Sequence, residues 1–418
     1  MKRLFVVFLV TCFLIAGSVT LAASKDELIV YHWWTAGGEK EAIDALFEAF
    51  LEEHPNAKIV ENPVAGGGGG IMRAQIKTMI MAGNPPDTFQ ITYGHGMISS
   101  FASVLQPIDK LIKGYNIPES VYEWGRVNGK MYGVPLNLMQ NNCLWYNTDL
   151  VEKLGIKMPI ESIYDFLVVC SKIKEAGYVP LAVGAGMGQK FWLGTLFEAI
   201  NSSLPGGGAD FLNEYYAGNI VPSESSVFKN TLQVMKTLID NNLINDDFSA
   251  LTWDQAGDLM ATGKAVFYVM GDWAKGHFTA MGLKPRVDFG YQPFPGSGGT
   301  FVGHADCFVL PVGVNKQLAK DWIKFLTTVK AANTFCPIKG AAPFVLDAPL
   351  DVYDSITKEI LGYFRDENVS KVLSQFGAPP ESYLDVFGTT FSKFFNNPVI
   401  NEDTLAEFDY AYEEVFGF

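Results

Sequence analysis

Residues 27–61, ELIVYHWWTAGGEKEAIDALFEAFLEEHPNAKIVE, set the architecture of the chain. Their first six residues have the apolar, β-branched content of a strand. Ile43, Phe47 and Phe50 then recur at helical spacing until Pro55 stops the pattern, and a second strand begins at Lys58. A strand, a helix and a strand in this order predict a βαβ unit with parallel strands.

The same alternation continues along the chain. A helix over residues 71–81 leads to Pro85-Pro86 and to a third strand at 88–91, which predicts a doubly wound first lobe. Ligands of such sheets bind beyond the carboxyl ends of the strands. Helices and short strands then alternate to about residue 300, so the middle of the chain forms a second α/β lobe. Residues 301–303 and 308–311 predict two strands that return to the first lobe, followed by helices from about Pro343.

The first 23 residues have the features of a secretory signal peptide. Lys2 and Arg3 precede an apolar run over residues 4–16, and small residues follow at 22–24. No later segment has the roughly 20 apolar residues that a bilayer-spanning helix requires. We therefore expect an exported, periplasmic protein.

The charge of the chain bears on its partners. Two of its 31 basic residues lie in the signal peptide, so 29 remain against 45 acidic residues, a net charge of −16. Such a surface repels nucleic acid and anionic lipid. Aromatic residues make up 13% of the chain, an early indication of flat apolar binding surfaces.

Neither metal nor nucleotide binding is predicted. The cysteines after the signal peptide, Cys143, Cys170, Cys307 and Cys336, show no CxxC spacing, and we expect buried free thiols rather than disulfides. The histidines form no ligand pair. The glycine run at 66–70 lacks the Gly-Lys-Ser/Thr ending of a phosphate-binding loop, so we expect no cofactor and interpret the run as a tight backbone path into a helix.

Two groups of residues combine tryptophan with a carboxylate. Trp33-Trp34 precede Glu39, and a buried-looking strand ends in Asp272-Trp273, with Trp253 earlier in the chain. A pyranose sugar has one apolar face and a rim of hydroxyls, which aromatic rings and carboxylates suit. Structural alternatives stay open: a core position for the tryptophans, a helix-dipole partner for Glu39 and a helix cap for Asp272.

The chain resembles the extracellular solute-binding proteins of family 1, and within them the glucose-type monosaccharide receptors. The motifs that carry the resemblance occur in order along nearly the whole chain: Trp33-Trp34-Thr35, Gly37-Gly38-Glu39, residues 63–69, Ala82 to Asp87, Val127-Asn128-Gly129-Lys130, Asn141-Asn142, Trp145-Tyr146-Asn147 and Met270 to Gly276.

The resemblance implies an α/β fold of the periplasmic binding protein type, with two doubly wound lobes joined by three hinge crossovers. The crossovers are expected near Asn137, Gly303 and Pro343. Lobe one then comprises 24–137 and 304–343, and lobe two comprises 138–303 and 344–418. Ligand is enclosed between the lobes by hinge closure.

The implied function is a monomeric receptor that captures a neutral sugar for an ABC importer, with the permease subunits as partners and no catalysis. The residues expected to bind the ligand are Trp33, Trp34, Glu39, Gln90, Asn141, Trp253, Asp272, Trp273, His304, Asp306 and Lys339.

Four departures from the family pattern leave the sugar open. Thr92, Cys143, His304 and Phe376 stand where the family often has a lysine, an aromatic residue, an asparagine and a histidine. A disaccharide, an N-acetyl sugar or another monosaccharide therefore fits as well as glucose, and His304 fits a structural role as well as a ligand contact.

An exported glycoside hydrolase is the alternative function. Such an enzyme needs two carboxylates flanking the scissile bond, at roughly 5 to 10 Å from each other. Glu39, Asp272 and Asp306 could supply such a pair, but no hydrolase motif accompanies them.

Overall fold

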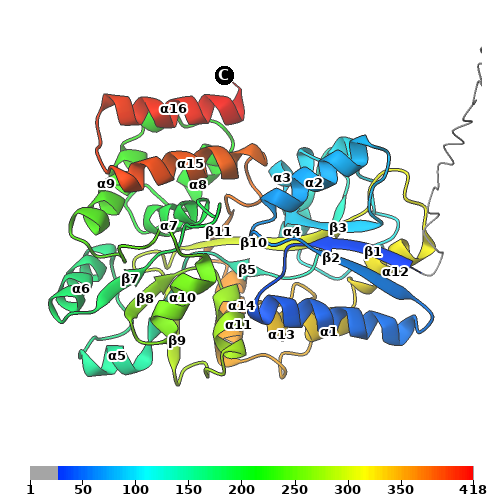
Figure 1. Ribbon diagram of the computed structural model, residues 1–418, viewed down its shortest axis with the longest axis horizontal. Helices are drawn as coiled ribbons and strands as arrows, with labels where there is room; N and C mark the ends of the chain where they lie inside the picture. Colours follow the sequence, from blue (N-terminus) through cyan, green and yellow to red (C-terminus); the bar gives the residue numbers. More distant parts are fainter. Residues whose placement is uncertain (1–26, 418) are drawn as a thin grey trace, which may run out of the picture.

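The structure is a computed structural model that describes residues 27–417. The predicted signal peptide lies outside the described residues. The chain contains two β-sheets, and Figure 1 shows one long strand of the first sheet, β10, running from one lobe into the other.

The first sheet has the order β11-β10-β3-β1-β2, and β4 and β5 pair with β10. Its strands are β1 (Glu27–His32), β2 (Lys58–Pro63), β3 (Thr88–Tyr93), β4 (Gly133–Pro135), β5 (Met139–Gln140), β10 (Thr300–Val309) and β11 (Ser370–Leu373). β1 pairs in parallel with both β2 and β3. The predicted βαβ opening is therefore confirmed.

The second sheet has the order β7-β8-β6-β9 and belongs to the second lobe. Its strands are β6 (Cys143–Asn147), β7 (Val179–Ala182), β8 (Ala265–Val269) and β9 (Phe289–Pro293). β8 is buried along its whole length, which agrees with the apolar strand expected before Asp272.

Helices surround both sheets (Figure 1). In the first lobe they are α1 (Gly37–Glu53), α2 (Gly70–Met81), α3 (His95–Ser99), α4 (Glu119–Gly125), α12 (Gln317–Phe325) and α13 (Val329–Lys339), with a 3-10 turn at Ala102–Val104. The others are α5 (Thr148–Lys153), α6 (Ile163–Glu175), α7 (Trp192–Asn201), α8 (Ala209–Tyr216), α9 (Ser226–Asp240), α10 (Trp253–Ala261), α11 (Trp273–Ala280), α14 (Ser355–Arg365), α15 (Ser382–Asn396) and α16 (Glu402–Phe416), with a 3-10 turn at Pro222–Glu224.

β10 corrects one prediction. Residues 301–303 and 308–311 were expected to form two separate strands, but β10 is continuous over ten residues, all of them buried. Its first part pairs with β11 and its second part with β3. The polar residues between the two apolar runs continue the strand, because His304 pairs with Met139 of β5 and Asp306 pairs with Thr92 of β3.

The predicted crossover positions lie side by side. Leu138 and Ala342 exchange two backbone hydrogen bonds, of 2.8 and 3.0 Å, and Met139 pairs with His304 in β10. The lobe boundaries predicted from the sequence stay a prediction.

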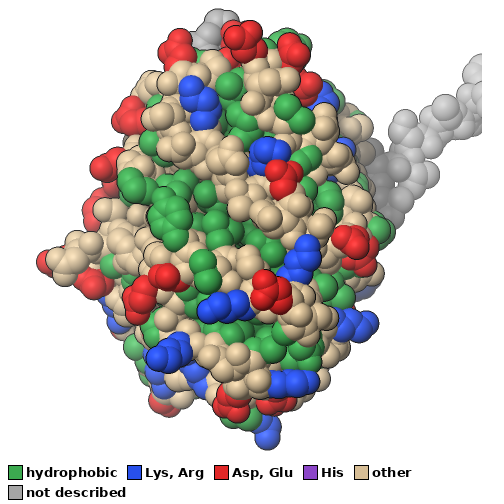
Figure 2. Space-filling model, turned by 90° about the vertical axis from the view of Figure 1, so that its left-hand side faces the viewer, with side chains coloured by type: hydrophobic (Ala, Val, Ile, Leu, Met, Phe, Trp, Pro, Cys, Tyr) green, Lys and Arg blue, Asp and Glu red, His purple; other side chains and the backbone are tan. Residues whose placement is uncertain are grey.

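The four cysteines are buried and unpaired, as expected. Among residues 27–417, no helix is long and apolar enough to cross a membrane, and no group of three or more His, Cys, Asp or Glu side chains could hold a metal ion. Figure 2 shows the end of the second lobe, where hydrophobic side chains gather near the middle and acidic side chains lie mostly around the rim.

Candidate functional site

A pocket lies between the two lobes, at the level where β10 passes from one to the other. The space between its side chains measures about 390 Å³, including the part that is open to solvent. Its lining consists of Trp33, Glu39, Gly67, Gly68, Thr92, Met139, Trp192, Trp253, Trp273, His304, Asp306, Lys339 and Phe376.

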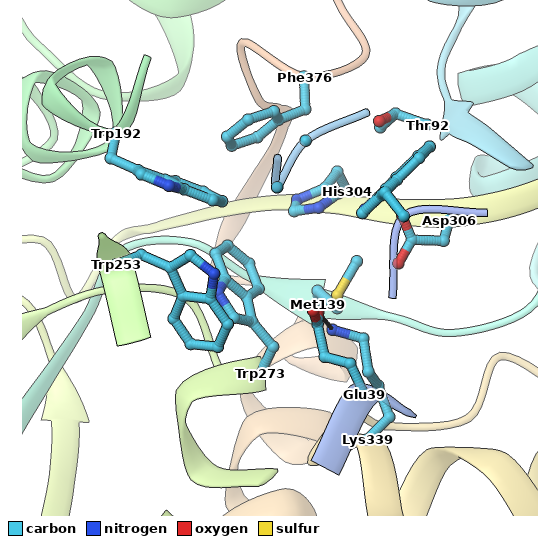
Figure 3. A pocket seen from close by; sticks show the side chains of 13 residues that line it. Glu39, Thr92, Met139, Trp192, Trp253, Trp273, His304, Asp306, Lys339 and Phe376 are labelled. Carbon is cyan, nitrogen blue, oxygen red and sulfur yellow. Dashed lines mark hydrogen bonds and ion pairs between the residues drawn. The ribbon is translucent and has the colours of Figure 1, made fainter. Parts of the chain in front are cut away.

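One side of the pocket is aromatic and the other is polar (Figure 3). We call the first side the aromatic wall, made of Trp192, Trp253, Trp273 and Phe376. The opposite side is the polar wall, made of Glu39, Thr92, Asp306 and Lys339. His304 lies between the two walls.

Each tryptophan of the aromatic wall is the first residue of a helix: α7, α10 or α11. The Gln189 side-chain carbonyl accepts hydrogen bonds from the Trp192 indole N–H, at 3.2 Å, and from the Trp253 backbone N–H, at 3.1 Å. The ring of Trp192 packs on Trp273 and Phe376, with centroid distances of 5.4 and 5.3 Å. Packing therefore fixes the ring of Trp192, and the shared acceptor holds both the Trp192 indole and the Trp253 backbone.

The polar wall is built on two helix ends that face the pocket. Glu39 lies in the first turn of α1, and Lys339 is the last residue of α13, where Gly340 adopts a left-handed conformation and ends the helix. An acid at an N-terminus and a base at a C-terminus suit the helix dipoles. The two side chains form an ion pair of 2.5 Å, and the Lys339 Nζ lies 5.7 Å from the centroid of the Trp273 ring.

Two neighbouring strands supply the rest of the polar wall. Asp306 of β10 pairs with Thr92 of β3, and the Asp306 backbone N–H donates to the Asn137 side chain at 2.9 Å. Burial raises the pKa of the Asp306 carboxyl to about 6, against the opposing effect of Lys339. Burial, together with Lys339, lowers the pKa of His304 to about 3. His304 is therefore neutral at physiological pH.

The glycine run makes room for aromatic rings at the edge of the pocket. Gly69 precedes α2 with a φ of 75°, and a Cβ there would lie 2.3 Å from the Trp33 ring. A Cβ at Gly68 would lie 2.8 Å from the ring of Phe191. Larger residues at these two positions would displace the rings, so the close approach requires glycine.

Seven of the residues expected from the sequence line the pocket: Trp33, Glu39, Trp253, Trp273, His304, Asp306 and Lys339. The other four, Trp34, Gln90, Asn141 and Asp272, are buried behind the lining. The Gln90 carbonyl accepts a hydrogen bond from the Trp33 backbone N–H at 3.1 Å, so Gln90 positions a pocket residue.

The placement of Trp34 corrects the expectation that both adjacent indoles face the ligand. Its ring is fully buried, with centroids 4.7 Å from Phe335 and 5.9 Å from Phe308. Successive side chains of an extended segment point to opposite sides, and this alternation persists past the end of β1. Trp34 therefore belongs to the core of the first lobe.

Asp272 also lies outside the lining. Its carboxyl is buried, has no hydrogen-bond partner among the described side-chain and backbone groups, and makes no capping bond to α11. Burial raises the pKa of Asp272 to about 8, although Lys275 and Lys339 oppose this shift. The carboxyl is therefore largely protonated near neutral pH.

Six lining residues were not among those expected to bind the ligand: Gly67, Gly68, Thr92, Met139, Trp192 and Phe376. Trp192 lies outside the two groups that were selected for combining tryptophan with a carboxylate, although Glu198 follows it at the spacing that separates Trp33 from Glu39. It could have been found by its place at the start of an apolar helix, which it shares with Trp253 and Trp273.

A comparison with known protein families now identifies the chain. The family model described as bacterial extracellular solute-binding protein matches residues 36–333, which is more than half of the sequence. The chain belongs to this family.

Relatives in this family extend over nearly the whole chain. An uncharacterized ABC transporter extracellular-binding protein of Pyrococcus horikoshii is 36% identical over 395 residues, which cover 92% of this chain and 87% of that protein. A probable sugar-binding periplasmic protein of Mesorhizobium japonicum is 29% identical, over 91% of this chain and 92% of that protein. Both are similar to this chain along almost their full length.

Solved structures agree on the fold. A chitin oligosaccharide binding protein superposes with a TM-score of 0.81 at 18% identity, covering 94% of this chain and 99% of its own. The family and its relatives are solute-binding receptors, so this solute-binding protein is a receptor and not an enzyme. The hydrolase alternative is therefore not supported.

Proposed function

We propose that this solute-binding protein is the receptor of an ABC importer and that it encloses a neutral sugar between its lobes. One observation carries the proposal: an aromatic wall and a polar wall face each other across the same small pocket. This arrangement matches the two surfaces of a pyranose, since aromatic rings pack on its C–H face and carboxylates accept its hydroxyl protons.

The charges around the pocket support a neutral ligand. Glu39 and Lys339 compensate each other in their ion pair, and His304 is neutral. Asp306, with a pKa of about 6, carries a negative charge at neutral pH. A sugar acid or a sugar phosphate would meet this charge inside a buried site, where repulsion is weakly screened.

The size of the pocket supports a small sugar. Its space of about 390 Å³ includes the part that is open to solvent, so the enclosed part is smaller still. A glucose-like monosaccharide is therefore the first candidate, and a short oligosaccharide the second. The name of the Mesorhizobium japonicum relative, a probable sugar-binding periplasmic protein, supports the ligand class.

The rest of the proposal concerns the receptor as a whole. We infer a monomer that is exported to the periplasm and delivers its sugar to the permease subunits. Residues 24–137 and 304–343 form one lobe and 138–303 and 344–418 the other, and they close about the crossovers near Asn137, Gly303 and Pro343.

Thermal unfolding with a panel of sugars tests the proposal. The panel contains D-glucose, D-galactose, D-xylose, maltose, N-acetylglucosamine and D-glucuronate. A ligand that binds only the folded state at a hundred times its Kd adds about 2.7 kcal/mol of stability. We expect at least one neutral sugar to raise the Tm and glucuronate to leave it unchanged. If glucuronate alone raises the Tm, the proposed ligand class is wrong.

A further inference from the structure

A line of three buried side chains leads from the second lobe to the pocket. Glu198 of α7 is fully buried, as is Asn141, which lies between β5 and β6, and His304 of β10 is 6% exposed and lines the pocket. The Asn141 Nδ2 lies 3.3 Å from the Glu198 Oε2. The Asn141 Oδ1 lies 2.7 Å from the His304 Nδ1. Asn141 therefore connects a buried acid to a pocket residue.

The partners of Glu198 fix the direction of every hydrogen bond in this line. Its Oε1 accepts from the Gln375 backbone N–H at 2.6 Å and from the Tyr216 hydroxyl at 2.8 Å. Above about pH 8 the carboxyl group is ionised, since its pKa is about 7, and it only accepts hydrogen bonds; Asn141 must then turn its NH₂ group toward Oε2. The carbonyl of Asn141 then faces His304.

The carbonyl of Asn141 determines the tautomer of His304. A carbonyl oxygen can only accept, so the His304 Nδ1 must carry the proton. The ring is neutral because its pKa is lowered to about 3 by burial and by Lys339, and its Nε2 therefore keeps a lone pair. Nε2 has no hydrogen-bond partner among the described residues, and the ring borders the pocket.

We propose that Glu198 and Asn141 are positioning residues that hold His304 in the Nδ1–H tautomer, so that its Nε2 accepts a hydrogen bond from a hydroxyl of the bound sugar. The role of Nε2 toward a sugar rests on the proposed function, whereas the tautomer does not. Asn141 then acts through His304 and makes no contact with the ligand.

The proposal specifies what the ligand must offer at this point. A hydroxyl donates to the Nε2 lone pair, whereas a fluorine in its place cannot donate and brings two electron-rich atoms together. A buried acceptor left without a donor weakens binding, so replacing this hydroxyl by fluorine should weaken binding about fivefold or more.

Replacing Glu198 by Gln should reverse the direction of the hydrogen bonds that connect residue 198, Asn141 and His304. The two donors at Oε1, from Gln375 and Tyr216, still require an oxygen there, so the new NH₂ group faces Asn141. The Asn141 amide must then flip and direct its NH₂ group to the His304 Nδ1. The His304 Nδ1 then accepts this hydrogen bond, and the proton of the neutral imidazole lies on Nε2. An Nε2–H group is a donor, so a fluorine atom of the sugar can accept from it. Tyr216→Phe is the matched control, since it removes another Glu198 partner and leaves the Asn141 bond in place.

The first test measures the tautomer without ligand. Long-range ¹H–¹⁵N spectra of protein labelled with ¹⁵N-histidine are recorded above about pH 8, because burial raises the pKa of Glu198 to about 7. His304→Asn assigns the signal. We expect Nδ1–H in the wild type and in Y216F, and Nε2–H in E198Q. An Nε2–H tautomer in the wild type overturns the proposal. Should E198Q fail to fold, Asn141→Ala removes the same acceptor and should abolish the tautomer preference.

The second test measures specificity by calorimetry. D-Glucose, D-galactose and D-xylose are compared with their monodeoxyfluoro derivatives in the wild type, E198Q and Y216F. For the sugar that binds, we expect one fluoro derivative to bind more weakly, by about fivefold or more, in the wild type and in Y216F. This ratio should fall by about fivefold or more in E198Q. An unchanged ratio in folded E198Q overturns the role of Nε2. If none of these sugars binds, the proposed ligands are wrong. The tautomer of His304, measured without ligand, still decides whether Glu198 and Asn141 are positioning residues.

Discussion

The two walls of the pocket are held in place by different forces. The rings of the aromatic wall pack on one another, as Trp192 does on Trp273 and Phe376. The side chains of the polar wall depend on an ion pair and on hydrogen bonds, such as those between Asp306 and Asn137. Figure 3 shows the contrast across a single pocket.

The difference indicates that the polar wall, which is needed for binding, lowers the stability of the fold. Burying an aromatic ring stabilises a protein through the apolar surface that it removes from water. Burying a carboxylate does the reverse, and the raised pKa of Asp306 measures that cost. Substitutions in the two walls should therefore weaken binding alike and change stability in opposite directions.

The largest effect should follow replacement of Trp273 by Ala. Trp273 contacts the rings of Trp192 and His304 and lies beneath the Lys339 ammonium group, so its loss opens one side of the pocket. We expect the sugar affinity to fall about a hundredfold, which is roughly 2.7 kcal/mol, in calorimetric titrations. The free energy of unfolding should fall by about 3 to 5 kcal/mol in urea titrations.

Trp322→Ala is the matched control for this prediction. Trp322 is fully buried in the first lobe, where it packs on Phe50 and Phe308. Its removal should cost a similar free energy of unfolding and leave the affinity of the folded protein nearly unchanged. Equal losses of affinity in the two variants would mean that instability, rather than a lost contact, explains the result for Trp273.

Replacement of Asp306 by Asn should come next. We expect an affinity loss of about tenfold at about pH 8, because a charged acceptor becomes a neutral one. Stability should move the other way: the pKa of Asp306 is raised from an ordinary value of 3.8 to about 6, so the folded state binds the proton more tightly than the unfolded chain does.

The sign of this shift defines the pH window. The cost of ionising Asp306 is absent below about pH 4 and fully present above about pH 6. Asp306→Asn should therefore stabilise the ligand-free protein by on the order of 3 kcal/mol at about pH 8, and by little at about pH 4. Urea titrations at both values measure the difference. A variant that is less stable at the higher value would show that the carboxylate stabilises the fold.

Local patterns predicted much of the fold, whereas contacts between distant segments required the structure. The helical spacing from Ile43 to Phe50 gave the βαβ opening, because one buried face needs that periodicity. The line from Glu198 through Asn141 to His304 joins residues 57 and 163 positions apart, and no local pattern encodes it. The pocket residue Trp192 was missed although its place at the start of an apolar helix was a local signal.

The pair Trp33-Trp34 shows most clearly what could not be predicted from the sequence. Both residues follow β1, and only backbone geometry decides that Trp33 lines the pocket while Trp34 enters the core. Composition and spacing treat the two alike. Their separation is therefore a finding of the structure, and it leads to the smallest effect expected here.

Trp34→Phe should change the sugar affinity less than about threefold, whereas Trp33→Phe should weaken it severalfold. The Trp34 Nε1 has no hydrogen-bond partner among the described residues, so phenylalanine removes a buried orphan donor and keeps the ring contacts with Phe308 and Phe335. Calorimetric titrations of the two variants measure the contrast between adjacent residues. An equal loss of affinity in both variants would mean that the buried Trp34 ring supports the pocket lining. The polar wall would then depend on aromatic packing, as the aromatic wall does.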